Sequence, residues 1–151
     1  MALRNLALCG WLGGLILLAV IATGHLTDPL TWLVMLNLFG VFPIYGLAVI
    51  LLGGRAAGNK NITHLWQQTG FRGLPPSFYH CFRIYFVLVW LLSAYPLIRQ
   101  VLKISSLPSF GLTPGVVFIL VPTAFHLIAA GIYWSVALEA RNSTASPPPL
   151  P

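Results

Sequence analysis

Four long apolar segments constrain this chain more than any other feature of its sequence. They cover residues 8–24, 29–52, 82–101 and 115–138, and each approaches the 20 or so mostly apolar residues that a helix needs to cross a bilayer. Backbone polar groups inside hydrocarbon must be paired within the segment, which favours a helix for each. The sequence therefore predicts an all-α, polytopic integral membrane protein built as a four-transmembrane-helix bundle.

The composition agrees with this assignment and limits what else the chain can contain. Of its 151 residues, 58% are hydrophobic and only 7% are charged, whereas soluble proteins carry about 25% charged residues. The longest polar interval, residues 53–80, is too short for an independent core. We therefore expect a membrane domain over residues 1–141, with an interfacial loop at 53–80, and a proline-rich tail at 142–151.

The first apolar segment has a second interpretation. A short basic start, an apolar run and small residues at Ala22 and Gly24 resemble a secretory signal peptide. The run is longer than the 7–15 residues typical of a signal peptide, so we expect a retained membrane anchor. Cleavage would leave three helices.

The basic residues predict the orientation of the bundle. With four spans, one side collects six of them and the other side only Arg99 and Lys103; the six are Arg4, Arg55, Lys60, Arg72, Arg83 and Arg141. This bias predicts that both termini are cytoplasmic. The sequon-like Asn61 and Asn142 would then face the wrong side for glycosylation, which favours a bacterial inner membrane.

The surplus of cations also indicates partners. The net charge is +6, with Asp28 and Glu139 as the only acids. Because the cations flank apolar segments, we expect contact with the lipid bilayer rather than with nucleic acid. Five residues in and around the middle loop are predicted to contact lipid headgroups or a partner subunit: Arg55, Lys60, Trp66, Arg72 and Arg83.

Polar residues within the spans predict an intramembrane polar layer. Counting helix rise from the non-cytoplasmic side brings five residues of three segments to similar depths: Asn37, Ser93, Tyr95, Thr123 and His126. Interhelical hydrogen bonds among such side chains commonly hold membrane bundles together. We therefore expect His126 to be structural.

An alternative hypothesis makes His126 a ligand of haem or chlorophyll. The other histidines fall near segment ends, so none pairs with His126 across one haem, and Met35 lies about 7 Å too shallow. A pigment or a haem shared with another subunit stays open. Transport is a third hypothesis, although neither acid falls inside a span.

The remaining chemistry is sparse. No catalytic arrangement or metal motif is recognisable, and Cys9 and Cys81 form no CxxC pair. By elimination, the sequence predicts a non-catalytic accessory, assembly or stabilising subunit of a larger membrane complex. A cofactor-binding subunit and a small transporter or channel are the alternatives.

Overall fold

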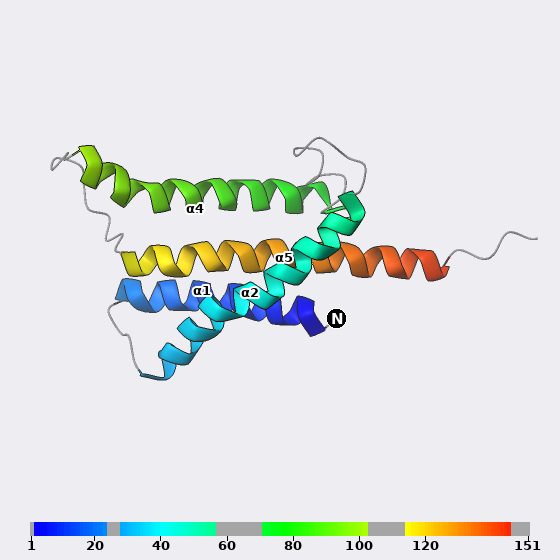
Figure 1. The fold of residues 1–151 in the computed structure, drawn as a ribbon, viewed down its shortest axis with the longest axis horizontal. Coiled ribbons are helices and arrows are strands. Elements are labelled where there is room, and N and C mark those ends of the chain that lie inside the picture. Colours follow the sequence, from blue (N-terminus) through cyan, green and yellow to red (C-terminus); the bar gives the residue numbers. More distant parts are fainter. Residues whose placement is uncertain (1, 24–27, 57–70, 103–113, 146–151) are drawn as a thin grey trace, which may run out of the picture.

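The computed structural model describes residues 2–23, 28–56, 71–102 and 114–145. These residues form the helices α1 (Ala2–Thr23), α2 (Asp28–Ala56), α4 (Pro76–Leu102) and α5 (Pro114–Ala145), and this part of the chain contains no strand (Figure 1). All four helices are long and apolar enough to cross a membrane. The predicted all-helical, four-span architecture is confirmed.

The helices extend beyond the predicted apolar segments. Proline begins α4 and α5 and is the second residue of α2, a position where its missing N–H needs no partner. Before α4, the amide of Leu74 donates to the carbonyl of Phe71 over 3.1 Å, in a turn that includes Gly73 at a φ of 79°. Glycine adopts this left-handed conformation without strain. The turn allows α4 to begin six residues before the predicted span.

At the other end of the chain, α5 continues to Ala145, into the predicted tail. The hydroxyls of Ser143 and Thr144 donate to the carbonyls of Glu139 and Arg141, over 2.9 and 2.8 Å. These bonds keep the last described turn of α5 helical beyond the predicted span. The rest of the predicted tail and residues 57–70 of the predicted loop lie outside the described residues.

The bundle is organised around α5. This helix contacts each of the other three, and α1 also contacts α2, whereas the main packing of α4 is against α5. Figure 1 shows α1, α4 and α5 running alongside one another, with α2 crossing α1 and α5 obliquely. As a result, 61% of the apolar window of α5 is buried but only 12% of that of α4. A large part of α4 is therefore exposed to whatever surrounds the bundle.

Small residues on α5 allow the aromatic side chains before and within α4 to pack closely. A Cβ added to Gly131 would lie 2.5 Å from the Phe71 ring, and that ring contacts Phe78 and Phe82 at centroid distances of 5.6 and 5.0 Å. These residues belong to the main core cluster, whose buried members are Ala7, Ile44, Ala48, Leu52, Phe71, Phe82, Ile128, Ala129, Ala130, Ile132 and Tyr133. The main core thus lies along the middle of α5, at residues 128–133.

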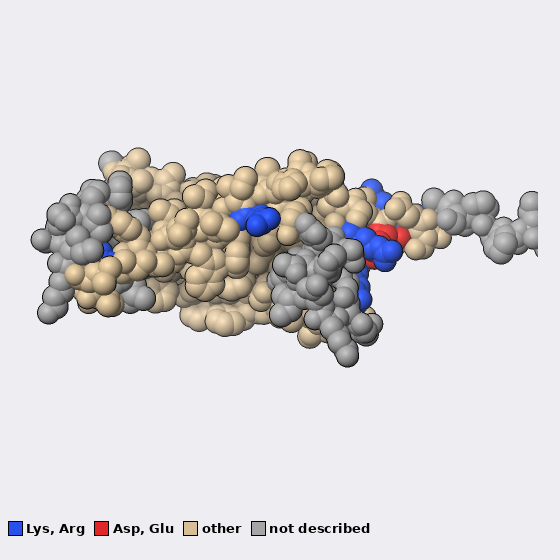
Figure 2. All heavy atoms as spheres, turned by 90° about the horizontal axis from the view of Figure 1, so that it is seen from above, with Lys and Arg blue, Asp and Glu red and all other residues tan. Residues whose placement is uncertain are grey.

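The length of α5 gives a depth scale. The rise from Pro114 to Trp134 is about 30 Å, which matches the thickness of a bilayer's hydrocarbon core. Thr123 and His126 lie near the middle of this stretch, and Glu139 lies beyond its Trp134 end. Figure 2 shows a largely tan body in which the red atoms and most of the blue atoms lie toward the C-terminal end of α5, with a further blue patch near the middle of this face.

Candidate functional site: a buried polar core and its surroundings

Three polar side chains of the predicted layer meet at mid-depth. Asn37, Thr123 and His126 have exposed fractions of 2%, 0% and 1%. The amide nitrogen of Asn37 donates to the carbonyl of Gly10 over 2.8 Å and to the hydroxyl of Thr123 over 3.2 Å. We call Gly10, Asn37, Thr123 and His126 the polar core. It joins α1, α2 and α5 through hydrogen bonds at the depth where water cannot substitute for them.

His126 completes the polar core from α5. Its Nε2 lies 3.0 Å from the backbone oxygen of Asn37. A carbonyl oxygen can only accept, so Nε2 carries the proton in this contact. In the described part of the chain, Nδ1 of His126 is buried without a hydrogen-bond partner. The ring is thus a donor that ties α5 to α2.

The hydroxyl of Thr123 both accepts and donates a hydrogen bond. It accepts from Asn37 and donates to the carbonyl of Ile119, one turn earlier in α5, over 2.6 Å. The local bond fixes the hydroxyl so that its lone pairs face α2. Asn37 and Thr123 therefore form one connected network.

Two glycines of α1 create the space for this network. A Cβ added to Gly10 would lie 2.7 Å from the His126 ring, and one added to Gly14 would overlap the Thr123 hydroxyl and lie 2.7 Å from the Asn37 amide. Side chains at either position would separate α1 from α5. The close approach of α1 therefore depends on glycine, as is common between membrane helices.

The structure brings together only part of the predicted layer. Ser93 and Tyr95 are half-buried on α4, and the bonds that define the polar core come from α1, α2 and α5. The hydroxyl of Ser93 is buried without a partner among the described residues. The contribution of α1 was missed because it is a backbone carbonyl, for which only the small residues Gly10 and Gly14 give any signal.

A second polar cluster lies at the C-terminal part of α5, after Trp134. Arg55 donates to the hydroxyl of Ser135 over 3.1 Å and pairs with Glu139. Ser135 donates to the backbone oxygen of Arg72 over 2.6 Å, and Nε of Arg72 lies 3.9 Å from Glu139. We call these four residues the charged cluster. It fastens the end of α2 and the turn before α4 to α5.

The residues predicted to contact headgroups or a partner subunit therefore have different surroundings in the structure. Arg55 is largely buried and engaged within the protein, whereas Arg72 and Arg83 are exposed. Lys60 and Trp66 lie outside the described residues. Among the described residues, fewer of these cations face outward than the sequence suggested.

The surroundings of His126 do not fit a haem or chlorophyll. The ring is 1% exposed, and α1 lies so close that even a methyl group on Gly10 would collide with it. A planar macrocycle needs open space beside the ligating nitrogen. Among the described residues, no group of three His, Cys, Asp or Glu side chains is placed to hold a metal ion.

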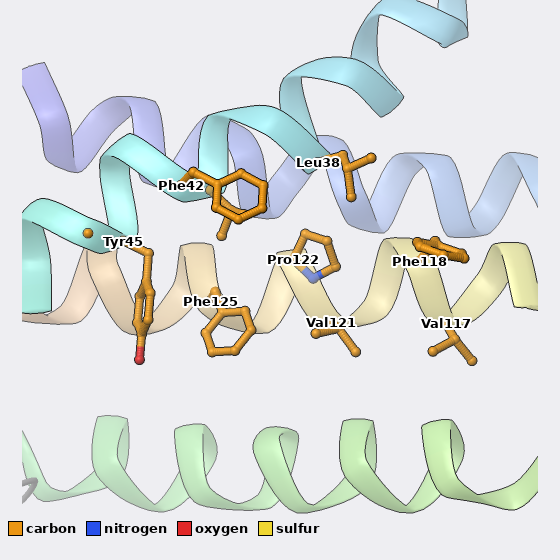
Figure 3. A pocket seen from close by; sticks show the side chains of 10 residues that line it. Leu38, Phe42, Tyr45, Val117, Phe118, Val121, Pro122 and Phe125 are labelled. Atoms are coloured by element: carbon orange, nitrogen blue, oxygen red, sulfur yellow. The ribbon is translucent and has the colours of Figure 1, made fainter. Parts of the chain in front are cut away.

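An apolar recess opens beside the polar core. It has a volume of about 540 Å³, and residues of α2 and α5 form its walls: Leu38, Val41, Phe42, Tyr45, Gly46, Val117, Phe118, Val121, Pro122 and Phe125. The rings of Tyr45 and Phe125 pack against each other with centroids 4.7 Å apart and planes tilted by 48°, and Figure 3 shows both rings pointing toward α4. The oblique crossing of α2 leaves this gap open to the side of the bundle.

The fold and the polar core define a multi-pass α-helical membrane protein whose helices are joined by buried hydrogen bonds. No family model, curated protein or solved structure matches the chain. The function must therefore be inferred from the molecule itself.

Proposed function

We propose that this protein is a non-catalytic accessory or stabilising subunit of a larger membrane complex, and that a transmembrane helix of a partner packs into the apolar recess. The observation that carries the proposal is the recess itself, which lies beside the polar core and is lined by apolar and aromatic side chains of α2 and α5. The proposed setting is a bacterial inner membrane with both termini cytoplasmic, as the positive charge bias favours.

The exposure of the recess walls supports packing by a helix. Phe42 and Phe118 are 70% and 66% exposed, so large aromatic side chains stand at the edges of the recess. Gly46 lies one helical turn after Phe42 in the same wall, and a Cβ there would meet nothing within 4 Å. A small residue beside large ones permits a neighbouring helix to approach closely.

The internal use of polar groups further supports a non-catalytic role. His126 and Thr123 are bonded within the bundle, and Glu139 is bound by arginines beyond the hydrocarbon. A transporter or a cofactor subunit would need such groups directed into a path or a cavity. Here they are directed toward neighbouring helices.

Site-directed photo-crosslinking in native membranes tests the proposal. A crosslinker replacing Phe42 or Phe118 should give one discrete membrane-protein adduct, whereas one replacing Leu12, which is 51% exposed on α1, should label lipid. Gly46→Leu fills the recess and should abolish the adduct and co-purification, while Gly53→Leu should not, because both glycines have open space around them. Crosslinking to lipid alone at all three positions would contradict the proposal.

A further inference from the structure

A second recess lies at the level of the charged cluster, between the start of α1 and the end of α5. It has a volume of about 310 Å³ and is lined by Ala2, Leu3, Arg4, Tyr133, Val136, Ala137 and Ala140. The depth scale places its centre just beyond Trp134, where hydrocarbon gives way to headgroups. Three of the seven lining residues are alanines, and Arg4 is the one charged residue among the seven.

Arg4 is held in an orientation suited to an anion. Its guanidinium carbon lies 5.4 Å from the centre of the Trp134 ring. Stacking on an aromatic face occupies the flat side of a guanidinium and leaves its N–H groups available at the edge. The Nε atom of Arg4 is buried and has no hydrogen-bond partner among the described residues.

Among the described residues, Arg4 makes no ion pair. Glu139, the one acid whose side chain the structure describes, is engaged by Arg55 and Arg72. Arg141 follows Ala140 of the recess and adds another exposed cation. A buried or half-buried guanidinium donor without an acceptor is costly, and a phosphate satisfies it with two parallel hydrogen bonds.

We propose that this recess binds the headgroup phosphate of an anionic phospholipid, with Arg4 donating to the phosphate oxygens. The small alanine side chains of the recess leave room for the glycerol end of the lipid, and the acyl chains of the lipid run along the bundle surface. Basic recesses between transmembrane helices are suited to such headgroups because anionic lipids concentrate at the membrane surface. This inference is independent of the proposed partner, which packs at a different recess.

Native mass spectrometry of the delipidated, detergent-solubilised full chain tests the proposal. We expect phosphatidylglycerol to bind more tightly than phosphatidylcholine with the same acyl chains. Arg4→Gln should weaken phosphatidylglycerol binding by roughly fivefold, the effect of about one cation near an anionic surface. It should weaken phosphatidylcholine binding less, because the choline cation of that lipid offsets the charge of its phosphate. Arg83→Gln, which removes an exposed cation outside the recess, should change binding less than twofold.

A second variant separates a shaped site from diffuse attraction. Ala137→Trp fills the recess but keeps every charge, so it should weaken phosphatidylglycerol binding as Arg4→Gln does. Equal effects of Arg4→Gln and Arg83→Gln, or no effect of Ala137→Trp, would overturn the proposal. Displacement of phosphatidylglycerol by millimolar inorganic phosphate would also overturn it and assign the recess to a free anion. Circular dichroism of each lipid-free variant verifies that the bundle is folded.

Discussion

Replacing Gly14 with alanine should damage the polar core far more than the size of one methyl group suggests. The added carbon would overlap the hydroxyl of Thr123 and lie 2.7 Å from the amide nitrogen of Asn37. Both groups are fixed by hydrogen bonds, to Ile119 and Gly10, so neither can move aside without breaking one. We expect α1 to shift away from α5.

The neighbouring glycine provides a matched control. A Cβ on Gly13 would meet only the Leu33 side chain at 3.6 Å, an ordinary contact. Gly13→Ala and Gly14→Ala share the same gain in helix propensity, so their difference isolates the collision. Overpacking costs about 1–3 kcal/mol, and weakening both bonds donated by Asn37 adds about 0.6 kcal/mol each. Gly14→Ala should therefore be less stable than Gly13→Ala by about 2–4 kcal/mol.

The assay is reversible unfolding in mixed micelles, followed by circular dichroism, with the free energy of unfolding compared between variants. Adding Thr123→Ala should partly rescue Gly14→Ala, because it removes the overlapping hydroxyl, although it loses one bond of its own. If the two glycine variants differ by less than about 0.5 kcal/mol, or if Thr123→Ala only adds to the damage, the close contact between α1 and α5 is not as described.

Three further predictions concern other bonds of the bundle. Asn37→Ala removes two buried donated bonds and leaves a small cavity, so the same unfolding assay should show a loss of about 2 kcal/mol; a loss below 0.5 kcal/mol would contradict the proposed network. Tyr133→Phe removes only the hydroxyl that donates to the backbone oxygen of Ile44 over 2.6 Å, and should cost about 0.6 kcal/mol without altering the helical content. Glu139→Gln leaves Arg55 without its carboxylate partner and should cost about 1 kcal/mol at 0.1 M salt. That cost should shrink at 1 M salt, since the pair is partly exposed and therefore screened, and a salt-independent cost would argue against an ionic origin.

The polar core shows where sequence reasoning succeeds and where it stops. Depth counting brought Asn37, Thr123 and His126 to similar levels because helix rise is fixed per residue. The same count placed Ser93 beside them, yet depth says nothing about which helix lies next to which. The structure joins α1 rather than α4 to the polar core, through a carbonyl that every residue possesses.

The charged cluster could be predicted only as a group of cations at one end. Arg55 and Arg72 both lie within the predicted interfacial loop, and their position outside the hydrocarbon follows from the cost of burying charge. Their pairing with Glu139, more than sixty residues away, depends on the contact of α2 with α5, two helices that run in the same general direction (Figure 1). Sequence spacing contains no information about that contact.

The sequence by itself determined that this protein has four membrane-crossing helices, because apolar segments of that length have no other stable form in a bilayer. It also determined the depth of each polar residue along its helix. Only the tertiary structure decided that α5 is the central helix, that glycines of α1 close the polar core, and that the oblique α2 leaves an open apolar recess. These features depend on helix crossing angles, which arise from how particular side chains fit across two surfaces and not from hydropathy.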